Sequence, residues 1–347
     1  MKNKLRPKKG KRPLSDTDAS TQGQHIAIPS IDWLQFDFRG FITLRPFYTW
    51  IMQTYSTRHF AKIAEARQNS FPIFEVTYCP KSEILPKDLN IVKLNNRECY
   101  WHNPVARLKE AGKNCNLSFH SVSRVDLCLD FSSFTRNYNP EGFIKNFMQN
   151  KYSSKKKRQG STNFDHGDNL QFHYLRLQAP RSNIGVYLYN KSHEMREVKK
   201  KNYIVNKWKT CGLDTSKDIW RLEFNIHNAK FDMIDKNTKK HMPFEIDKLD
   251  DNYYLQDVIK VLIDNYFTFY QKTNTRARNC KTKVELFNFP PTKQTIKFRD
   301  ESRTTDRGDR IFLNKLQDLN NELRCIKRAE ADSCNQIIKY IKKTRQL

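Results

Sequence analysis

The stretch Arg-Val-Asp-Leu-Cys-Leu-Asp-Phe at residues 124–131 alternates polar and apolar residues, as do Val-Tyr-Leu-Tyr-Asn-Lys at 186–191 and Trp-Arg-Leu-Glu-Phe at 220–224. A period of two is typical of β-strands with one apolar and one polar face. The predicted polar faces carry acids, hydroxyls and cations, namely Arg124, Asp126, Cys128, Asp130, Tyr187, Tyr189, Lys191, Arg221, Glu223 and Asn225. If the three strands share one sheet, these groups lie on one surface and form a set able to cut a phosphodiester bond.

The charge of the chain indicates a polyanionic partner. The 347 residues include 63 Lys plus Arg against 37 Asp plus Glu, a formal net charge of +26. Such an excess favours nucleic acid over an acidic membrane. There is no run of about eighteen apolar residues, so we expect no membrane span. The basic N-terminus has no apolar segment, which predicts that no secretory signal is present.

The eight cysteines form no Cys-x-x-Cys pair and no zinc-finger spacing. We therefore expect reduced thiols and a cytoplasmic location.

Composition divides the chain into four parts. Residues 1–24 are basic, then rich in Ser, Thr and Asp, and are predicted to be a disordered arm that either follows the DNA backbone or acts as a solubilising tail. Residues 25–290 are expected to form one catalytic domain. A linker at 291–308 follows, and 309–347 repeat apolar residues at helical spacing. That C-terminal helical segment either packs on its own domain or pairs with a second copy as a homodimer.

The order of predicted elements favours an α+β fold. Strands are expected at 31–38 and 71–78, a helix from Pro104 to Ala111 with Gly112 as its C′ residue, and then the strand at 124–131. Further helices are expected from Pro140 to Asn150 with Asn139 as N-cap, within Ser192–Thr210 and from Tyr253 to about Gln271, and a polar loop at 151–169. This order predicts an antiparallel sheet with helices on its apolar face.

Four motifs resemble those of the replication initiation factor family. This group contains rolling-circle initiators of plasmids and phages and the related relaxases of conjugative elements. The motifs are Arg124-x-Asp126-x-x-x-Asp130-Phe131, Ser182-Asn183 with Tyr189-Asn190-Lys191 and Glu194, Trp220-Arg221-x-Glu223, and Ile31-Asp32-Trp33-Leu34. The resemblance covers about residues 31 to 290. Asn225 departs from the plasmid members, which tend to have a second acid there, and no His-x-His metal motif occurs.

The resemblance implies a DNA nickase with an antiparallel nuclease sheet of the rolling-circle initiator type. By position, Tyr189 would attack the backbone, become linked to the 5′ phosphate and release a 3′ hydroxyl. Because tyrosine has a pKa near 10, it needs a neighbouring base, cation or metal. Lys191 and Arg221 would hold phosphate oxygens, and Glu194 would orient the nucleophile or complete a metal shell.

Oxygen ligands suit Mg²⁺ or Mn²⁺. The expected ligands are Asp126 and Glu223, with Asp130 as a third candidate. The residues alone leave other readings open. Tyr189 could be an ordinary strand tyrosine, Tyr187 could be the nucleophile, and the acids could form cross-strand ion pairs with Arg124 and Arg221.

Two basic segments are predicted to hold DNA phosphates, and steep weakening by salt is expected if they do. Their residues are Lys155, Lys156, Lys157, Arg158, Lys199, Lys200 and Lys201. The expected partner is double-stranded or hairpin origin DNA, with a host helicase and polymerase acting after the nick. Two alternatives remain at this stage: a relaxase of an integrative mobile element, and an origin-binding protein without enzymatic activity.

Overall fold

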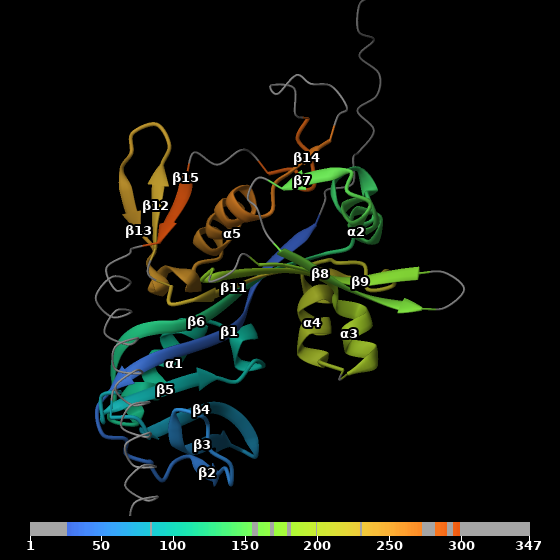
Figure 1. Cartoon of the computed structure of the whole chain (residues 1–347). Coiled ribbons are helices and arrows are strands. Elements are labelled where there is room, and N and C mark those ends of the chain that lie inside the picture. Colours follow the sequence, from blue (N-terminus) through green and yellow to red (C-terminus); the bar gives the residue numbers. More distant parts are fainter. Residues whose placement is uncertain are drawn as a thin grey trace, which may run out of the picture.

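The structure is a computed structural model, and it describes residues 26–83, 85–154, 159–166, 170–178, 182–198, 200–229, 231–272, 282–289 and 294–298. A ten-stranded sheet runs through it in the order β2-β3-β4-β5-β1-β6-β11-β10-β9-β8 (Figure 1). Its strands are β1 Ala27–Arg39, β2 Thr49–Met52, β3 Phe60–Gln68, β4 Phe71–Pro80, β5 Leu89–Leu94, β6 Ser118–Phe131, β8 Gln159–His166, β9 Leu170–Gln178, β10 Ile184–Asn190 and β11 Trp220–His227. Every neighbouring pair is antiparallel. The predicted α+β fold with a large antiparallel sheet is thereby confirmed.

Two small sheets lie beside the large one. One joins β12 Phe231–Asp235 to β13 His241–Pro243 and β15 Gln294–Phe298, and the other joins β7 Tyr152–Ser154 to β14 Phe269–Gln271. β15 falls inside the stretch predicted as a linker, and β7 and β8 fall inside the predicted loop at 151–169. The arm at 1–24 and the C-terminal segment at 309–347 lie outside the described residues.

The helices divide between the two faces of the sheet (Figure 1). They are α1 Pro104–Asn114, α2 Pro140–Met148, α3 Lys191–Glu197, α4 Asn202–Thr210 and α5 Asn252–Tyr266, with 3₁₀ turns η1 Glu98–Tyr100, η2 Thr135–Asn137 and η3 Ile246–Asp250. Side chains of α1, α2 and α5, such as Leu108, Phe143 and Leu262, join the main core against strand residues such as Phe36. α3 and α4 instead form a second, smaller apolar cluster with Ile28 and Ile219. Helices on a single face were therefore the wrong expectation.

The helix boundaries in the structure agree with the predicted ones in some places and differ in others. The Asn139 side chain accepts a bond from the Glu141 backbone N–H, as expected of an N-cap. The segment from Ser192 to Thr210 is two helices rather than one. α5 stops at Tyr266, so Phe269 belongs to a strand. Met148, the last residue of α2, is exposed although it is apolar.

Gly112 lies within α1 and does not terminate it. The helix continues to Asn114. A glycine is needed at position 112 because the Phe38 ring of β1 lies against the helix backbone there. A Cβ at Gly112 would lie 2.1 Å from Phe38 Cε1. The glycine therefore sets how closely the helix approaches the sheet.

Gly112→Ala is expected to destabilise the protein by about 1–3 kcal/mol, because the added methyl overpacks the core. Gly142→Ala in α2 is the matched control. There the new Cβ would meet only Tyr138 Cε2, at 3.5 Å, and alanine is the better helix former. Urea unfolding should show opposite shifts of the midpoint for the two variants. Equal shifts would contradict the close-approach explanation.

Two further observations concern the environment of the chain. Within the ranges that the structure describes, none of the helices has the length and apolar character to cross a bilayer. The five described cysteines are Cys79, Cys99, Cys115, Cys128 and Cys211, and all are free thiols.

Candidate active site

The three stretches quoted at the outset are neighbouring strands. In the register of the sheet, Glu223 of β11 lies opposite Cys128 of β6 on one side and opposite Tyr187 of β10 on the other. Arg221 lies opposite Asp130 and Tyr189 in the same way. The expectation that these polar faces form one surface is therefore confirmed.

A bulge in the central strand β1 adds a carboxylate that sequence reasoning did not assign. The pairing of β1 with β6 steps from Ile31–Leu127 to Trp33–Asp126, which leaves Asp32 as an extra residue. A bulge re-aims side chains, and here Asp32 comes to the polar face, where it meets Arg221. The sequence motif Ile31-Asp32-Trp33-Leu34 contains this residue, but no periodicity in the sequence indicates where a bulge will fall.

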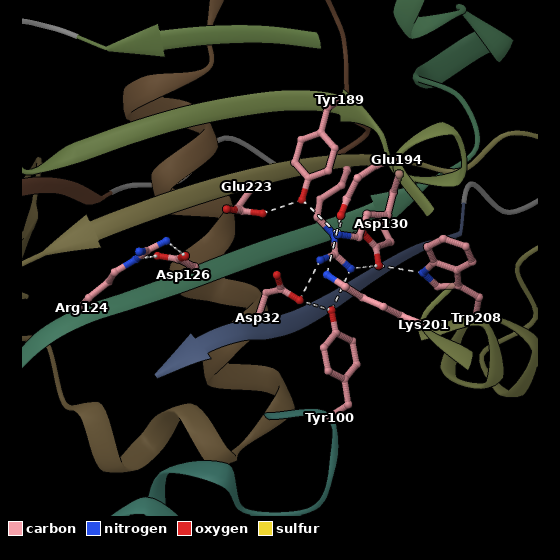
Figure 2. Close-up of polar contacts among 12 residues, drawn as sticks. Asp32, Tyr100, Arg124, Asp126, Asp130, Tyr189, Glu194, Lys201, Trp208 and Glu223 are labelled. Atoms are coloured by element: carbon pink, nitrogen blue, oxygen red, sulfur yellow. Dashed lines mark hydrogen bonds and ion pairs between the residues drawn. The ribbon is translucent and has the colours of Figure 1, made fainter. Parts of the chain in front are cut away.

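Arg221 is the centre of a buried ion-pair cluster. Figure 2 shows the partners that surround it, Asp32, Tyr100, Asp130 and Trp208. Its side chain is 0% exposed, and its Nε and Nη2 donate to Asp130 at 2.7 and 2.8 Å. Nη1 lies 2.9 Å from Asp32 Oδ1 as an ion pair without hydrogen-bond alignment, and Nη2 also donates to the Tyr100 hydroxyl at 2.8 Å. Trp208 Nε1 donates to Asp130 Oδ2 at 2.7 Å. Tyr100 and Trp208 come from η1 and α4, and the strand pattern gave no signal for either.

This cluster changes the interpretation of two predicted site residues. Both Asp130 oxygens accept hydrogen bonds, Oδ1 from Arg221 and Oδ2 from Arg221 and Trp208, so this carboxylate belongs to the buried ion-pair cluster. Arg221 is enclosed by its partners, so it organises the site from beneath. Arg221 and its neighbours hold the pKa of Asp32 well below its usual range, against the opposing effect of burial.

Tyr189 points at Glu223 from the adjacent strand (Figure 2). Its hydroxyl donates to Glu223 Oε2 at 2.7 Å, and Lys191 Nζ lies 3.5 Å from the same hydroxyl. Lys191 begins α3, is 1% exposed and pairs with Glu194 at 2.5 Å. Burial, followed by the charge of Glu223, raises the pKa of Tyr189 well above its usual value. The hydroxyl is therefore protonated at neutral pH, with a carboxylate in place to receive the proton.

Tyr187 shares the face with Tyr189 but has different surroundings. Its ring lies over Gly185, where an added Cβ would come within 2.9 Å of the ring. The Arg176 guanidinium lies 5.6 Å from the ring centroid. The contacts of the two residues thus favour Tyr189, with its bond to Glu223, as the tyrosine that can react.

Two acids near Tyr189 hold protons more tightly than usual. Burial, together with the charges of Asp32 and Asp126, raises the pKa of Glu223 to about 7. Burial raises the pKa of Asp126 to about 6, even though Arg124 donates to both of its oxygens, at 3.0 and 2.5 Å. Glu223 is therefore poised to exchange a proton near neutral pH.

The raised pKa of Glu223 predicts that stability falls as pH rises. Between the ordinary value of 4.5 and about 7, the folded protein holds a proton that the unfolded chain has lost. The stability that this proton contributes, about 3 kcal/mol at most, is complete below pH 4.5 and is lost by about pH 7. Glu223→Gln should flatten this part of the stability–pH curve in EDTA, measured by urea unfolding. An unchanged slope would contradict the assignment.

The donor set fits a divalent ion only in part. Asp126, Asp130 and Glu223 all have carboxylate oxygens that already accept hydrogen bonds, Asp126 from Arg124, Asp130 from Arg221 and Trp208, and Glu223 from Tyr189. No group of three or more His, Cys, Asp or Glu side chains close enough to hold a metal occurs in the described ranges.

The basic segments are only partly described. Lys155, Lys156, Lys157, Arg158 and Lys199 lie outside the described residues. Lys200 is exposed, and Lys201 Nζ lies 3.6 Å from Glu194 Oε1. Lys201 is therefore linked through Glu194 to Lys191 at the candidate site.

The chain was compared with protein families, curated proteins and solved structures. The sequence matches no protein-family profile and no curated protein. Among solved structures, the chain is similar to the rolling circle replication initiator protein from Geobacillus stearothermophilus. That similarity has a TM-score of 0.42 and 13% sequence identity, over 74% of this chain and 92% of the other.

Proposed function

We propose that this protein initiates rolling-circle replication by site-specific nicking and joining of single-stranded DNA at an origin. The observation that carries the proposal is the Tyr189 hydroxyl, bonded to Glu223 and 3.5 Å from Lys191 Nζ. A nucleophile next to a base and a cation is the arrangement that covalent catalysis requires. The net charge of +26 supports a nucleic-acid substrate.

The proposed step exchanges one phosphodiester bond for another. The Tyr189 oxygen attacks the phosphorus while its proton passes to Glu223 Oε2. The bond from phosphorus to the 3′ oxygen breaks, the 5′ phosphate stays on the tyrosine, and the 3′ oxygen takes a proton from water and leaves as a hydroxyl. The proton on Glu223 then passes to the hydroxide that remains. Lys191 stabilises the charge that builds on the phosphate oxygens. The reverse reaction joins the strands.

Asp126 and Glu223 would hold Mg²⁺ or Mn²⁺ through their carboxylate oxygens. When bound, the ion would polarise the scissile phosphate. Asp130 and Arg221 are positioning residues in this proposal, since Arg221 and Asp130 bond to each other below the reacting groups.

The proposal is tested by trapping a covalent adduct. Full-length protein is mixed with supercoiled DNA that carries the element's own origin, with Mg²⁺ or Mn²⁺, and is then denatured. We expect a protein–DNA adduct whose peptide map assigns the DNA to Tyr189. Tight binding without an adduct in either metal would overturn the enzyme and leave an origin-binding protein.

Metal binding is expected to stabilise the folded protein. Mn²⁺ at about a hundred times its Kd should add about 2.7 kcal/mol and raise Tm. Asp126→Asn and Glu223→Gln should each remove most of that gain. Asp247→Asn is the control, because that carboxylate is 68% exposed and lies on η3. A gain that survives in both site variants would place the ion elsewhere.

A further inference from the structure

We propose that a groove beside the candidate active site binds the unpaired DNA strand next to the cut, by stacking bases on aromatic side chains. The inference rests on the proposed function, because it names where that substrate lies. The groove is formed by the start of β1, the segment around η1, α4 and the start of α5. We call it the η1–α4 groove.

The size of the groove suits an extended ligand. Its volume is about 1400 Å³, whereas pockets for small molecules are usually about 300–1,000 Å³. A chain of several nucleotides needs a site of this size. Each base needs a flat surface, and each phosphate needs a cation.

Aromatic side chains supply the flat surfaces. Trp101, Tyr253 and Phe71 line the groove and are 55%, 82% and 54% exposed. Large apolar rings gathered at one exposed site mark a binding surface more often than a structural one. Tyr100 and Tyr203 lie deeper, with ring centroids 5.2 Å apart in edge contact. Stacking on rings of this kind tolerates any base, as an unpaired strand requires.

The charge of the groove matches phosphate. Its lining includes four cations, Arg97, Lys200, Lys201 and Lys207. The only acid among the described lining residues is Asp250, which already accepts bonds from the backbone N–H groups of Val105 and Ala106 at the start of α1. The groove therefore presents positive charge that is not neutralised from within.

Two of the cations also lie next to aromatic rings of the lining. The Arg97 guanidinium lies 4.6 Å from the Phe71 ring centroid, and Lys207 Nζ lies 5.5 Å from the Tyr100 centroid. Interleaved cations and rings let a strand place its bases and phosphates in turn. A duplex, with its bases stacked inward, cannot use the rings.

Two residues connect the groove to the reacting groups. Tyr100 lines the groove with its ring, while its hydroxyl donates to Asp32 at 2.5 Å. Lys201 also lines the groove and pairs with Glu194, which in turn pairs with Lys191 beside Tyr189. Side chains that line the groove are therefore bonded to the groups that surround the nucleophile.

The test measures binding of a fluorescent oligothymidine to the full chain carrying Tyr189→Phe, so that no covalent step contributes. Trp101→Ala should weaken binding about 5- to 150-fold, the range of one lost stacking contact, and Trp101→Phe should retain most of the affinity. Tyr253→Ala should also weaken it, whereas Tyr55→Ala, at a tyrosine that is 60% exposed outside the groove, should not.

Salt dependence tests the cations separately. Lys207→Ala should lower the slope of log K against log salt by about 0.7, the value for one phosphate contact on a single strand. Lys209→Ala is the matched control, because Lys209 lies on the same helix, is exposed and does not line the groove.

The outcomes separate this inference from the proposed function. Unchanged oligothymidine binding in Trp101→Ala and Tyr253→Ala would overturn the groove, even if wild type forms the Tyr189 adduct. Equal weakening of a matched duplex would also overturn it, because stacking would not be the cause. Weakened single-strand binding alone would support the groove, even if no adduct ever forms.

Discussion

Tyr189→Phe is expected to abolish the covalent adduct and to lower the rate of nicking by about a thousandfold or more, as the loss of a nucleophile does in other enzymes. Phenylalanine keeps the ring in β10 and removes only the hydroxyl that donates to Glu223. The fold and the affinity for DNA should therefore be retained. Quantified conversion of supercoiled to nicked origin DNA under single turnover is the appropriate measurement.

Tyr187→Phe is the matched control for this prediction. It lies on the same strand and face, two residues away, and its ring covers Gly185. Its variant should nick at close to the wild-type rate. The reverse result, with activity lost only in Tyr187→Phe, would keep the enzyme and reassign its nucleophile. Nicking that survives both changes would exclude tyrosine chemistry on this strand.

Arg221→Met is expected to destabilise the protein by about 3–5 kcal/mol. Removal of one partner of a buried ion pair leaves the other charge without compensation, and here Asp130 and Asp32 would both lose their cation. Methionine keeps much of the volume, so the loss would arise from charge and not from a cavity. Urea unfolding at neutral pH gives the free energy directly.

Two further variants isolate the cause. The double variant Arg221→Met/Asp130→Asn removes the uncompensated charge of Asp130. The side-chain oxygen of the introduced asparagine can still accept the hydrogen bond from Trp208, so part of the lost stability should return. Arg39→Ala breaks a surface pair with Asp88, whose side chains are 37% and 30% exposed, and should lose no more than about 1 kcal/mol. If Arg221→Met loses no more than this surface control, the buried cluster is not a major source of stability.

Periodicity predicted the sheet more completely than it predicted the site. Alternation at 124–131, 186–191 and 220–224 was sufficient to place three strands with a common polar face, because the period of a strand fixes which side chains share a side. It could not predict how deeply each polar side chain is buried. Arg221 and Glu223 lie on the same face of one strand, yet Arg221 is enclosed by Asp130 and Asp32, whereas Glu223 is only partly buried.

The periodicity of the strands also could not predict which residues other elements contribute to the site. Asp32 reaches the site through a bulge, Tyr100 through a single 3₁₀ turn and Trp208 through a helix packed on the polar face. Gly112 was misread for a related reason, since its role depends on a ring 74 residues earlier in the chain, Phe38. Each of these contacts is set by tertiary packing, which local sequence does not encode.

The position of Tyr189 within the sheet has a consequence for the whole reaction cycle. β10 is hydrogen-bonded to a strand on each side, β11 and β9, so its backbone is among the least mobile parts of the molecule. A tyrosine on such a strand cannot swing out to follow the DNA. Under the proposed mechanism the severed 5′ end would stay covalently attached at one fixed point while the new strand is synthesised. Closing the circle would then require the free 3′ end to return to that point.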